Sequence, residues 1–312
     1  MAHVNIAWWY EGNLNAQAFQ EDVDALAAAG LQVVATSIRA WEITGFEIQE
    51  GHIVRNAQGQ PVLHKWEQEL DAYRDVLAYA KSKGLKVHAH VSPNWHADLS
   101  EEDYLFVSRE TFSFVAEALA EEVDVWQLWN EAESHDYRTY QPLSGLDERY
   151  LEGFRDVLLA AAQEIRKEDP NARIAVNAGG FYGGSGRSAT QSRWLAFFDS
   201  FQPLISQDIV TDLKLNIYTE GDNAGLSASI EKFKKYGTGL WVGEFGVCTE
   251  NRPFTQEDRR RILLETAGVL RQLNSVQGVN LYRMRDGAEP GCEGSFGVQE
   301  QTWAQEVLQA MR

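Results

Sequence analysis

Two glutamates, each at the end of an apolar run, are the strongest chemical signal in the sequence. Glu131 closes Val123-Asp-Val-Trp-Gln-Leu-Trp-Asn-Glu131, and Glu244 closes Gly239-Leu-Trp-Val-Gly-Glu244. An unpaired carboxylate is costly to bury, so such residues seldom end buried strands by chance. A facing carboxyl pair can cleave a glycosidic bond, because one acid protonates the leaving oxygen and the other attacks or stabilises the anomeric carbon. Mutual repulsion and unequal burial would separate their pKa values as this division requires.

The elements that must position these acids alternate regularly along the chain. Eight strand–helix pairs in strict alternation predict parallel strands with crossover helices, and eight is the number that closes a barrel. We therefore predict an α/β fold, a single (β/α)8 TIM barrel with elaborated loops on its C-terminal face, and one catalytic domain over residues 1–312. A doubly wound open sheet is the alternative, but the first strand–helix turn lacks a G-x-G-x-x-G pattern.

The expected strands and helices follow from these patterns. The strands are His3–Tyr10, Leu31–Arg39, Leu85–Val91, Val123–Asn130, Ala172–Asn177, Asp212–Tyr218, Gly239–Phe245 and Val276–Tyr282. The clearest helices are Gln20–Ala29, Trp66–Lys83, Arg109–Glu122, Asp147–Glu168, Gln191–Phe201, Ser227–Tyr236, Thr255–Leu273 and Gln301–Met311.

Two long loops interrupt the alternation, and both follow strands. Residues 40–63 contain a predicted hairpin around Asn56-Ala-Gln-Gly59, and residues 179–187 are rich in glycine. Both loops fall at the C-terminal ends of strands, where barrels place their active sites.

Composition excludes several classes of protein. The chain has 312 residues, 44% hydrophobic and 24% charged, with 7 Pro, 25 Gly and a formal net charge of −18. It is neither disordered nor collagenous, and it has no apolar run long enough to span a membrane. The negative charge argues against nucleic acid or an anionic lipid surface as partner. The start carries no leader signal, so we expect a cytoplasmic protein or a mature form whose leader was removed.

The acids and their neighbours also resemble a known group of enzymes. Trp126-x-x-Trp129-Asn130-Glu131 and Gly243-Glu244-Phe245-Gly246 resemble the two catalytic signatures of the clan A glycoside hydrolases, with family 5 and family 39 nearest. These are barrel enzymes with acids on strands four and seven, and the similarity runs along the whole chain, as in Asn216-Ile-Tyr218 on the sixth strand.

The resemblance implies a role for each matched residue. Glu131 would be the acid/base and Glu244 the nucleophile of a retaining mechanism. Asn130 would hold the sugar 2-hydroxyl, Tyr218 and Arg39 would orient Glu244, and His90 would lie in the floor of the minus-one subsite. No cofactor is expected.

The eighth strand departs from the family pattern. Many clan members have a tryptophan platform there, whereas this chain reads Leu281-Tyr-Arg-Met-Arg-Asp286 and has Arg283 in that place. Either Tyr282 or another aromatic supplies the platform, or the subsite takes a ligand that arginine prefers, such as an acidic sugar.

Further residues leave alternatives open. His88 and His90 share one face of a strand and could bind a metal, but the other ligands that such barrels need are not evident, so no metal is expected. Trp9, Trp41, Trp95 and Trp129 lie near strand ends as sugar platforms or as packing residues, whereas Trp66, Trp194 and Trp303 are expected to pack. Cys248 and Cys292 follow neighbouring strands, so a disulfide between them is possible.

These observations predict a retaining glycoside hydrolase that acts on a β-linked oligo- or polysaccharide. Tryptophan-rich loops favour an endo-acting polysaccharidase, with an exo-acting β-glycosidase as the alternative. A catalytically silent carbohydrate-binding barrel is the alternative of a different class. The sugar, the linkage, the compartment and the oligomeric state are not specified by the sequence.

Overall fold

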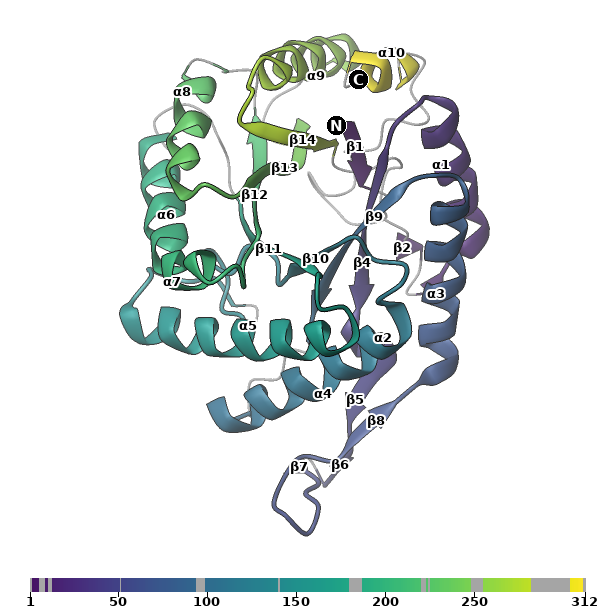
Figure 1. Ribbon diagram of the computed structural model, residues 1–312, viewed down its shortest axis with the longest axis vertical. Helices are drawn as coiled ribbons and strands as arrows, with labels where there is room; N and C mark the ends of the chain where they lie inside the picture. The colour runs from purple at the N-terminus through teal and green to yellow at the C-terminus, as the bar shows by residue number, and fades with distance from the viewer. Residues whose placement is uncertain are drawn as a thin grey trace.

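Eight parallel strands close into one barrel in the computed structural model, which describes residues 2–5, 9–10, 13–50, 52–93, 99–139, 141–179, 187–219, 223, 225–247, 255–281 and 304–310. Each strand pairs with the next along the chain, and the first pairs with the last, which closes the ring (Figure 1). The predicted (β/α)8 barrel is confirmed. Its strands are β1 (Ala2–Asn5), β4 (Val33–Arg39), β9 (Lys86–Ser92), β10 (Val125–Leu128), β11 (Arg173–Ala178), β12 (Asp212–Thr219), β13 (Gly239–Val247) and β14 (Val276–Leu281).

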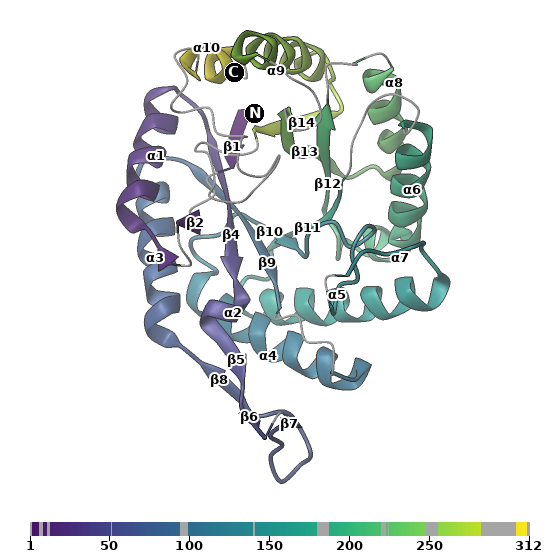
Figure 2. The same cartoon turned by 180° about the vertical axis from the view of Figure 1, so that it is seen from behind.

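Helices surround the barrel on its outside, as the view from behind also shows (Figure 2). The apolar stripe of each helix faces the outward side of the strands, as expected when a parallel sheet is covered by its crossovers. The helices are α1 (Ala16–Ala28), α2 (Ala40–Ile43), α3 (Glu67–Ser82), α4 (Glu101–Leu119), α5 (Glu148–Glu168), α6 (Arg187–Ser200), α7 (Gln202–Ser206), α8 (Leu226–Glu231), the 3₁₀ helix η2 (Lys232–Tyr236), α9 (Gln256–Arg271) and α10 (Ala304–Ala310).

Three predicted boundaries were wrong, each for a local reason. The first strand ends at Asn5 and not at Tyr10, because Trp9–Tyr10 forms a separate strand, β2, which pairs antiparallel with β3 (Asn13–Leu14). Helix α4 begins before the predicted Arg109, because the Ser100 hydroxyl caps it by accepting the Asp103 N–H at 3.1 Å. The segment predicted as one helix over Ser227–Tyr236 divides into α8 and η2.

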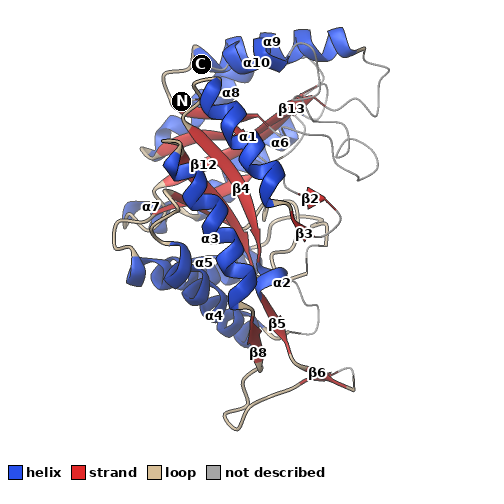
Figure 3. Cartoon of the chain, turned by 90° about the vertical axis from the view of Figure 1, so that its right-hand side faces the viewer, coloured by secondary structure: helices blue, strands red, loops and turns tan. Residues whose placement is uncertain are grey.

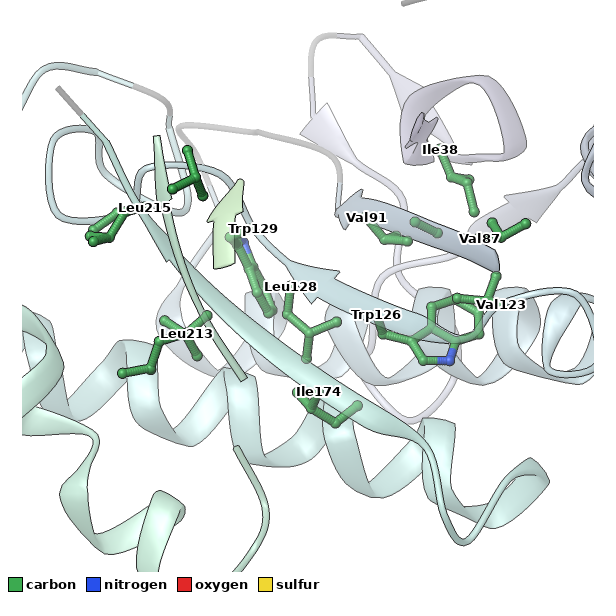
Figure 4. Close-up of a cluster of buried hydrophobic side chains, with 14 of the residues drawn as sticks. Ile38, Val87, Val91, Val123, Trp126, Leu128, Trp129, Ile174, Leu213 and Leu215 are labelled. Carbon is green, nitrogen blue, oxygen red and sulfur yellow. The ribbon is translucent and has the colours of Figure 1, made fainter. Parts of the chain in front are cut away.

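The hydrophobic core fills the space between the strands and the helices. Apolar residues at alternate strand positions point outward, among them Ile38 of β4, Val87 and Val91 of β9, and Leu213 and Leu215 of β12 (Figure 4). All of these side chains are buried. The core is therefore a ring around the barrel, and its packing keeps the strand ends in place.

The other face of the strands fills the barrel with polar side chains. Inward positions hold His90, Gln127, Asn177, Lys214 and Asn216, which come from four different strands. Asn177 Nδ2 donates to Asn216 Oδ1 at 2.7 Å, so the side chains are joined across the lumen. Such an interior needs its polar groups paired, because a buried group left without a partner is costly.

A long antiparallel hairpin follows β4 and projects away from the barrel (Figure 3). β5 (Thr44–Phe46) pairs with β8 (Leu63–Lys65), and β6 (Ile48–Gln49) pairs with β7 (His52–Ile53). The predicted turn at Asn56–Gly59 is present: Gly59 donates its N–H to Asn56 O at 2.9 Å and has a φ of 79°. The hairpin is longer than predicted.

Within the described part of the chain, no helix has the length and apolar character needed to cross a lipid bilayer.

Candidate active site

The turn at the end of β10 puts Glu131 at the mouth of the barrel. Trp129 and Glu131 both have positive φ angles, 56° and 50°, in a region that non-glycine residues seldom occupy. The ring of Trp129 is buried, lies 5.4 Å from the ring centroids of Phe112 and Phe154, and donates its N–H to the Tyr104 hydroxyl at 3.0 Å. This packing holds the turn in a conformation that would otherwise be unfavourable.

Glu131 is held by side chains from two other strands, one on its carboxyl and one on its backbone N–H. Asn216 Nδ2 of β12 donates to Glu131 Oε1 at 2.9 Å, and Asn177 Oδ1 of β11 accepts the Glu131 backbone N–H at 2.9 Å. Asn130 is held in turn by Gln127 Nε2 at 3.1 Å and by Asn216 Nδ2 at 3.3 Å, both on its Oδ1. Asn216 therefore joins Asn130 and Glu131 in one hydrogen-bonded group.

Glu244 lies on β13, next to the strand that carries Asn216 and Tyr218. It is the register partner of Asn216, and the Tyr218 hydroxyl donates to Glu244 Oε2. A β-bulge at this place is possible because Gly243 has no side chain: a Cβ there would come within 2.9 Å of Asn216 Oδ1 and 3.0 Å of Lys214 Cβ. The bulge directs the carboxyl of Glu244 toward Tyr218.

Both acids are thus anchored on one strand, β12. Asn216 contacts Glu131 and Tyr218 contacts Glu244, and these anchors are two residues apart on the same face. Two residues of a strand span roughly 6.6 Å, at about 3.3 Å per residue. The two glutamates therefore follow β10 and lie on β13, and each is held by a side chain of the same strand.

A buried lysine on the same strand supplies positive charge near Glu244. Lys214 of β12 is 3% exposed, and burial lowers its pKa to about 8, against the opposing charges of Asp212 and Glu244. The Lys214 ammonium is therefore charged at neutral pH, and it favours an ionised carboxylate at Glu244.

His90 lies near Lys214 in the lumen and is neutral. Burial, and then the charge of Lys214, lower the pKa of His90 to about 3. Its Nδ1 lies 3.0 Å from the Ser37 hydroxyl and its Nε2 lies 2.9 Å from the Ser92 hydroxyl, so both ring nitrogens have partners. No group of three or more His, Cys, Asp or Glu side chains in the described ranges is arranged to hold a metal ion.

A third carboxyl lies beside Glu131. Glu133 is completely buried, and its Oε1 accepts the Gly179 N–H and the Ser134 hydroxyl, both at 2.8 Å. Burial, and then the negative charge of Glu131, raise the pKa of Glu133 to about 8. This group is therefore protonated at neutral pH.

Arg39 and Trp41 lie at the end of β4, on the side of the hairpin. Arg39 Nη1 donates to Glu42 Oε1 at 2.9 Å, and its guanidinium carbon lies 5.5 Å from the centre of the Trp41 ring. Trp41 is 43% exposed, which leaves ring surface open to a ligand. The predicted role of Arg39 in orienting Glu244 stays a prediction.

Two of the other tryptophans differ in how far they are buried. Trp194 is buried, as expected for a packing residue, whereas Trp66 is 43% exposed and packs through only part of its ring. The Trp66 ring covers Gly45 of the hairpin, where a Cβ would come within 2.5 Å of it, because Trp66 precedes α3 and does not lie within it.

Several predicted residues cannot be placed. Trp95, Tyr282, Arg283, Cys248, Cys292 and Trp303 lie outside the described residues, and only the backbone of Trp9 is described. Three residues near the two acids, Asn177, Lys214 and Glu133, did not stand out in the sequence. Alternation along Asp212–Tyr218 is the signal that would have indicated Lys214, since it shares a face with Asn216 and Tyr218.

Part of the chain matches a known protein family. The family described as "Glycosyl hydrolase catalytic core" matches residues 161–306, which include Glu244. No curated protein sequence matches the chain.

Solved structures with the same fold are numerous. A structure of two fungal β-1,4-galactanases has 14% identity and a TM-score of 0.66, covering 98% of this chain and 98% of that chain. The β-glucosidase of Pyrococcus furiosus has 13% identity and a TM-score of 0.65, covering 94% and 83%. The β-glycosidase of Thermosphaera aggregans has 13% identity and a TM-score of 0.67, covering 94% and 84%.

The barrel, the carboxyls at its mouth and the match to a catalytic core lead to one conclusion. The chain is a glycoside hydrolase built on a (β/α)8 barrel that resembles the clan A enzymes.

Proposed function

We propose that the protein is a retaining β-glycosidase that cleaves an oligo- or polysaccharide by double displacement, with residues 1–312 acting as one catalytic domain. Glu131 is the acid/base and Glu244 the nucleophile. The observation that carries this proposal is the anchoring of both carboxyls on one face of β12, through Asn216 and Tyr218. Retaining enzymes hold their two carboxyls closer together than inverting enzymes do, and anchoring on one strand supports such a short separation.

The surroundings of the two acids support different protonation states for them. The Lys214 ammonium and the Tyr218 hydroxyl lie by Glu244 and favour its ionised form. Glu131 has a third carboxyl, Glu133, nearby, and the repulsion between two carboxylates favours retention of a proton on Glu131. Asn130 holds the 2-hydroxyl of the sugar, and His90 contributes a neutral floor.

We prefer an endo-acting polysaccharidase. The exposed rings of Trp41 and Trp66 lie beside the hairpin that follows β4, and exposed aromatic rings stack on sugar faces. The galactanases, which act on a polymer by their name, are also matched over nearly the whole of both chains. A screen of purified β-linked polysaccharides, read by the size of the products, tests this: oligosaccharides of mixed length support endo action, and single sugars from chain ends contradict it.

Covalent labelling tests the mechanism. A 2-fluoro glycoside is expected to trap a glycosyl-enzyme on Glu244, which peptide mass spectrometry locates. No labelling, together with no hydrolysis across a panel of glycans, would contradict the enzyme proposal. The alternative would then be a barrel that binds sugars without cleaving them.

Glu131→Gln tests the acid role. We expect it to slow cleavage of glycosides with poor leaving groups by 10²-fold or more, at the level of about 10²–10⁴ that general acid catalysis contributes. Activated aryl glycosides need little proton donation, so their first step should be slowed much less. Equal slowing of both substrates in steady-state kinetics would remove Glu131 from the acid role.

A further inference from the structure

Glu133 is a buried acid that the proposed mechanism does not yet use. Its side chain is 0% exposed, and its Oε2 has no hydrogen-bond partner among the described residues. An ionised carboxylate with an unpaired oxygen is costly in such a place, whereas a protonated acid is tolerated. The burial of Glu133 therefore favours the form that keeps its proton.

Glu133 and Glu131 meet at the same backbone unit. Gly179, just after β11, donates its N–H to Glu133 Oε1 at 2.8 Å. The Cα of Gly179 lies against Glu131, so closely that a Cβ there would come within 1.9 Å of Glu131 Oε1. Two carboxyls that share one glycine cannot easily both carry a negative charge.

The other groups around Glu133 do not neutralise it. On its own segment lie Glu131, Ser134 and His135, and burial and then Arg193 lower the pKa of His135. From α5, Tyr150 donates its hydroxyl to the carbonyl of His135 at 3.0 Å, and from α6, Trp194 donates its N–H to Gly179 O at 2.8 Å. Among the causes of the raised pKa of Glu133 there is a carboxylate and no cation.

We propose that Glu131 and Glu133 form a coupled carboxyl pair that shares its last proton once the first has left, and that Glu133 is a positioning residue for the proton of Glu131. This inference rests on the proposed function, since it requires Glu131 to be the acid/base. In the first half of the reaction the Glu131 proton goes to the leaving oxygen as Glu244 bonds to the anomeric carbon, while Glu133 keeps its own proton. In the second half Glu131 takes a proton from water as the water oxygen displaces Glu244.

The pair also changes how activity falls with rising pH. Once one proton has left, the other is distributed over both carboxyls, so a fraction of molecules still carries it on Glu131. That fraction is lost only when the pair gives up its last proton, and the pKa of Glu133 places this loss at about pH 8. The wild-type enzyme thus retains acid catalysis beyond the ordinary range of a carboxyl group.

Glu133→Gln tests the shared proton, because the amide oxygen still accepts the Gly179 N–H and the second ionisable group is gone. On a glycoside with a poor leaving group, we expect the alkaline limb of kcat/KM to move down by about one pH unit or more. On an activated aryl glycoside the limb should stay near that of the wild type. The matched control is Glu152→Gln, an exposed glutamate of α5, which should leave both profiles unchanged. Superimposable alkaline limbs for Glu133→Gln and the wild type would overturn the proposal.

A measurement that needs no substrate separates this inference from the proposed function. Between pH 5 and 8 the folded protein binds one more proton at Glu133 than the unfolded chain, so wild-type stability falls over this range. The melting temperature of Glu133→Gln minus that of the wild type should therefore increase as the pH rises from 5 to 8. A gap that does not change with pH would overturn the shared proton, whatever the enzyme hydrolyses. A growing gap with no hydrolysis of any glycan would instead overturn the proposed function alone.

Discussion

At the scale of single residues, Gly179 determines how closely the backbone after β11 approaches Glu131, the proposed acid/base. Its contact with Glu131 leaves no space for a methyl group, although its φ is one that alanine can adopt. The atoms in the way are Oε1, Cδ and Cγ of the Glu131 side chain and not backbone atoms, so the side chain must move while the fold can remain. The consequence of a larger residue is a displaced carboxyl and not an unfolded protein.

Gly179→Ala is therefore expected to separate activity from stability. We expect kcat to fall by about 100-fold, since a shift of about 1 Å at a reacting group can cost that much. The free energy of unfolding should change by only about 1 kcal/mol. Steady-state kinetics and urea unfolding measure the two effects.

Gly145→Ala is the control for this variant, because Gly145 has no atom within 4 Å of the added methyl group. It should leave kcat unchanged. Full activity in Gly179→Ala would show that the position of Glu131 does not depend on this contact.

Some residues near the two acids could be identified from the sequence and others could not, and the difference lies in their sequence context. Glu131 and Glu244 stand out because acids rarely end apolar strands. Glu133 does not, since an acid in a polar loop segment looks exposed until the chain folds and covers it completely. Lys214 was missed for a similar reason, because only closure of the barrel turns that face of β12 away from water.

At the scale of elements, the alternation of strands and helices was predictable, whereas the ends of elements were not. Parallel pairing follows from periodicity that extends over many residues, so all eight barrel strands could be located. The cap at Ser100 and the antiparallel pair β2–β3 depend on one or two contacts, which periodicity does not register. The turn residues of the hairpin after β4 indicated that a hairpin is present. Its full length depends on the pairing of β5 with β8 and of β6 with β7, which the turn residues do not indicate.

The hairpin is attached to α4 by ion pairs. Arg55 makes a two-pronged contact with Asp103, at 2.7 Å for both bonds, and Lys65 Nζ lies 3.0 Å from Glu110 Oε2. Pairs this exposed contribute roughly 0–1 kcal/mol each. These ion pairs therefore add little to the stability of the barrel.

Shortening this element tests its role in substrate binding. Residues 47–62 can be replaced by Asn-Gly, a two-residue turn suited to joining β5 and β8. We expect unfolding free energy within about 1 kcal/mol of the wild type, unchanged hydrolysis of an aryl monoglycoside, and KM for a soluble polysaccharide raised about tenfold. Unchanged polymer kinetics would remove the hairpin from the binding cleft.

At the scale of the whole molecule, two buried groups make the free energy of unfolding depend on pH. Their effects have opposite signs and lie in different pH ranges. Glu133 lowers stability as the pH rises toward about 8, as described above. Lys214 has a folded pKa of about 8 and an ordinary value of 10.5, so the folded protein binds fewer protons than the unfolded chain between these values. The cost of charging Lys214 is therefore full below pH 8 and disappears as the pH approaches 10.5.

Lys214→Met should make the protein more stable and less active at pH 7. The linkage gives a gain of at most about 3 kcal/mol, from about 1.4 kcal/mol for each pKa unit. The gain should shrink between pH 8 and 10.5, and kcat should fall because Glu244 loses a nearby positive charge. Chemical unfolding across this range measures the gap, with the exposed Lys86→Met as control. A gain independent of pH would contradict a charged, buried Lys214.

The anchoring of both carboxyls on β12 has a consequence for enzyme engineering. The distance between Glu131 and Glu244 depends on the residue spacing along one strand, through Asn216 and Tyr218. It does not depend on the loops that contact the glycan. Loops grafted from other barrels onto the same strand ends should therefore change which polymer is cut, while the anomeric configuration of the product stays the same.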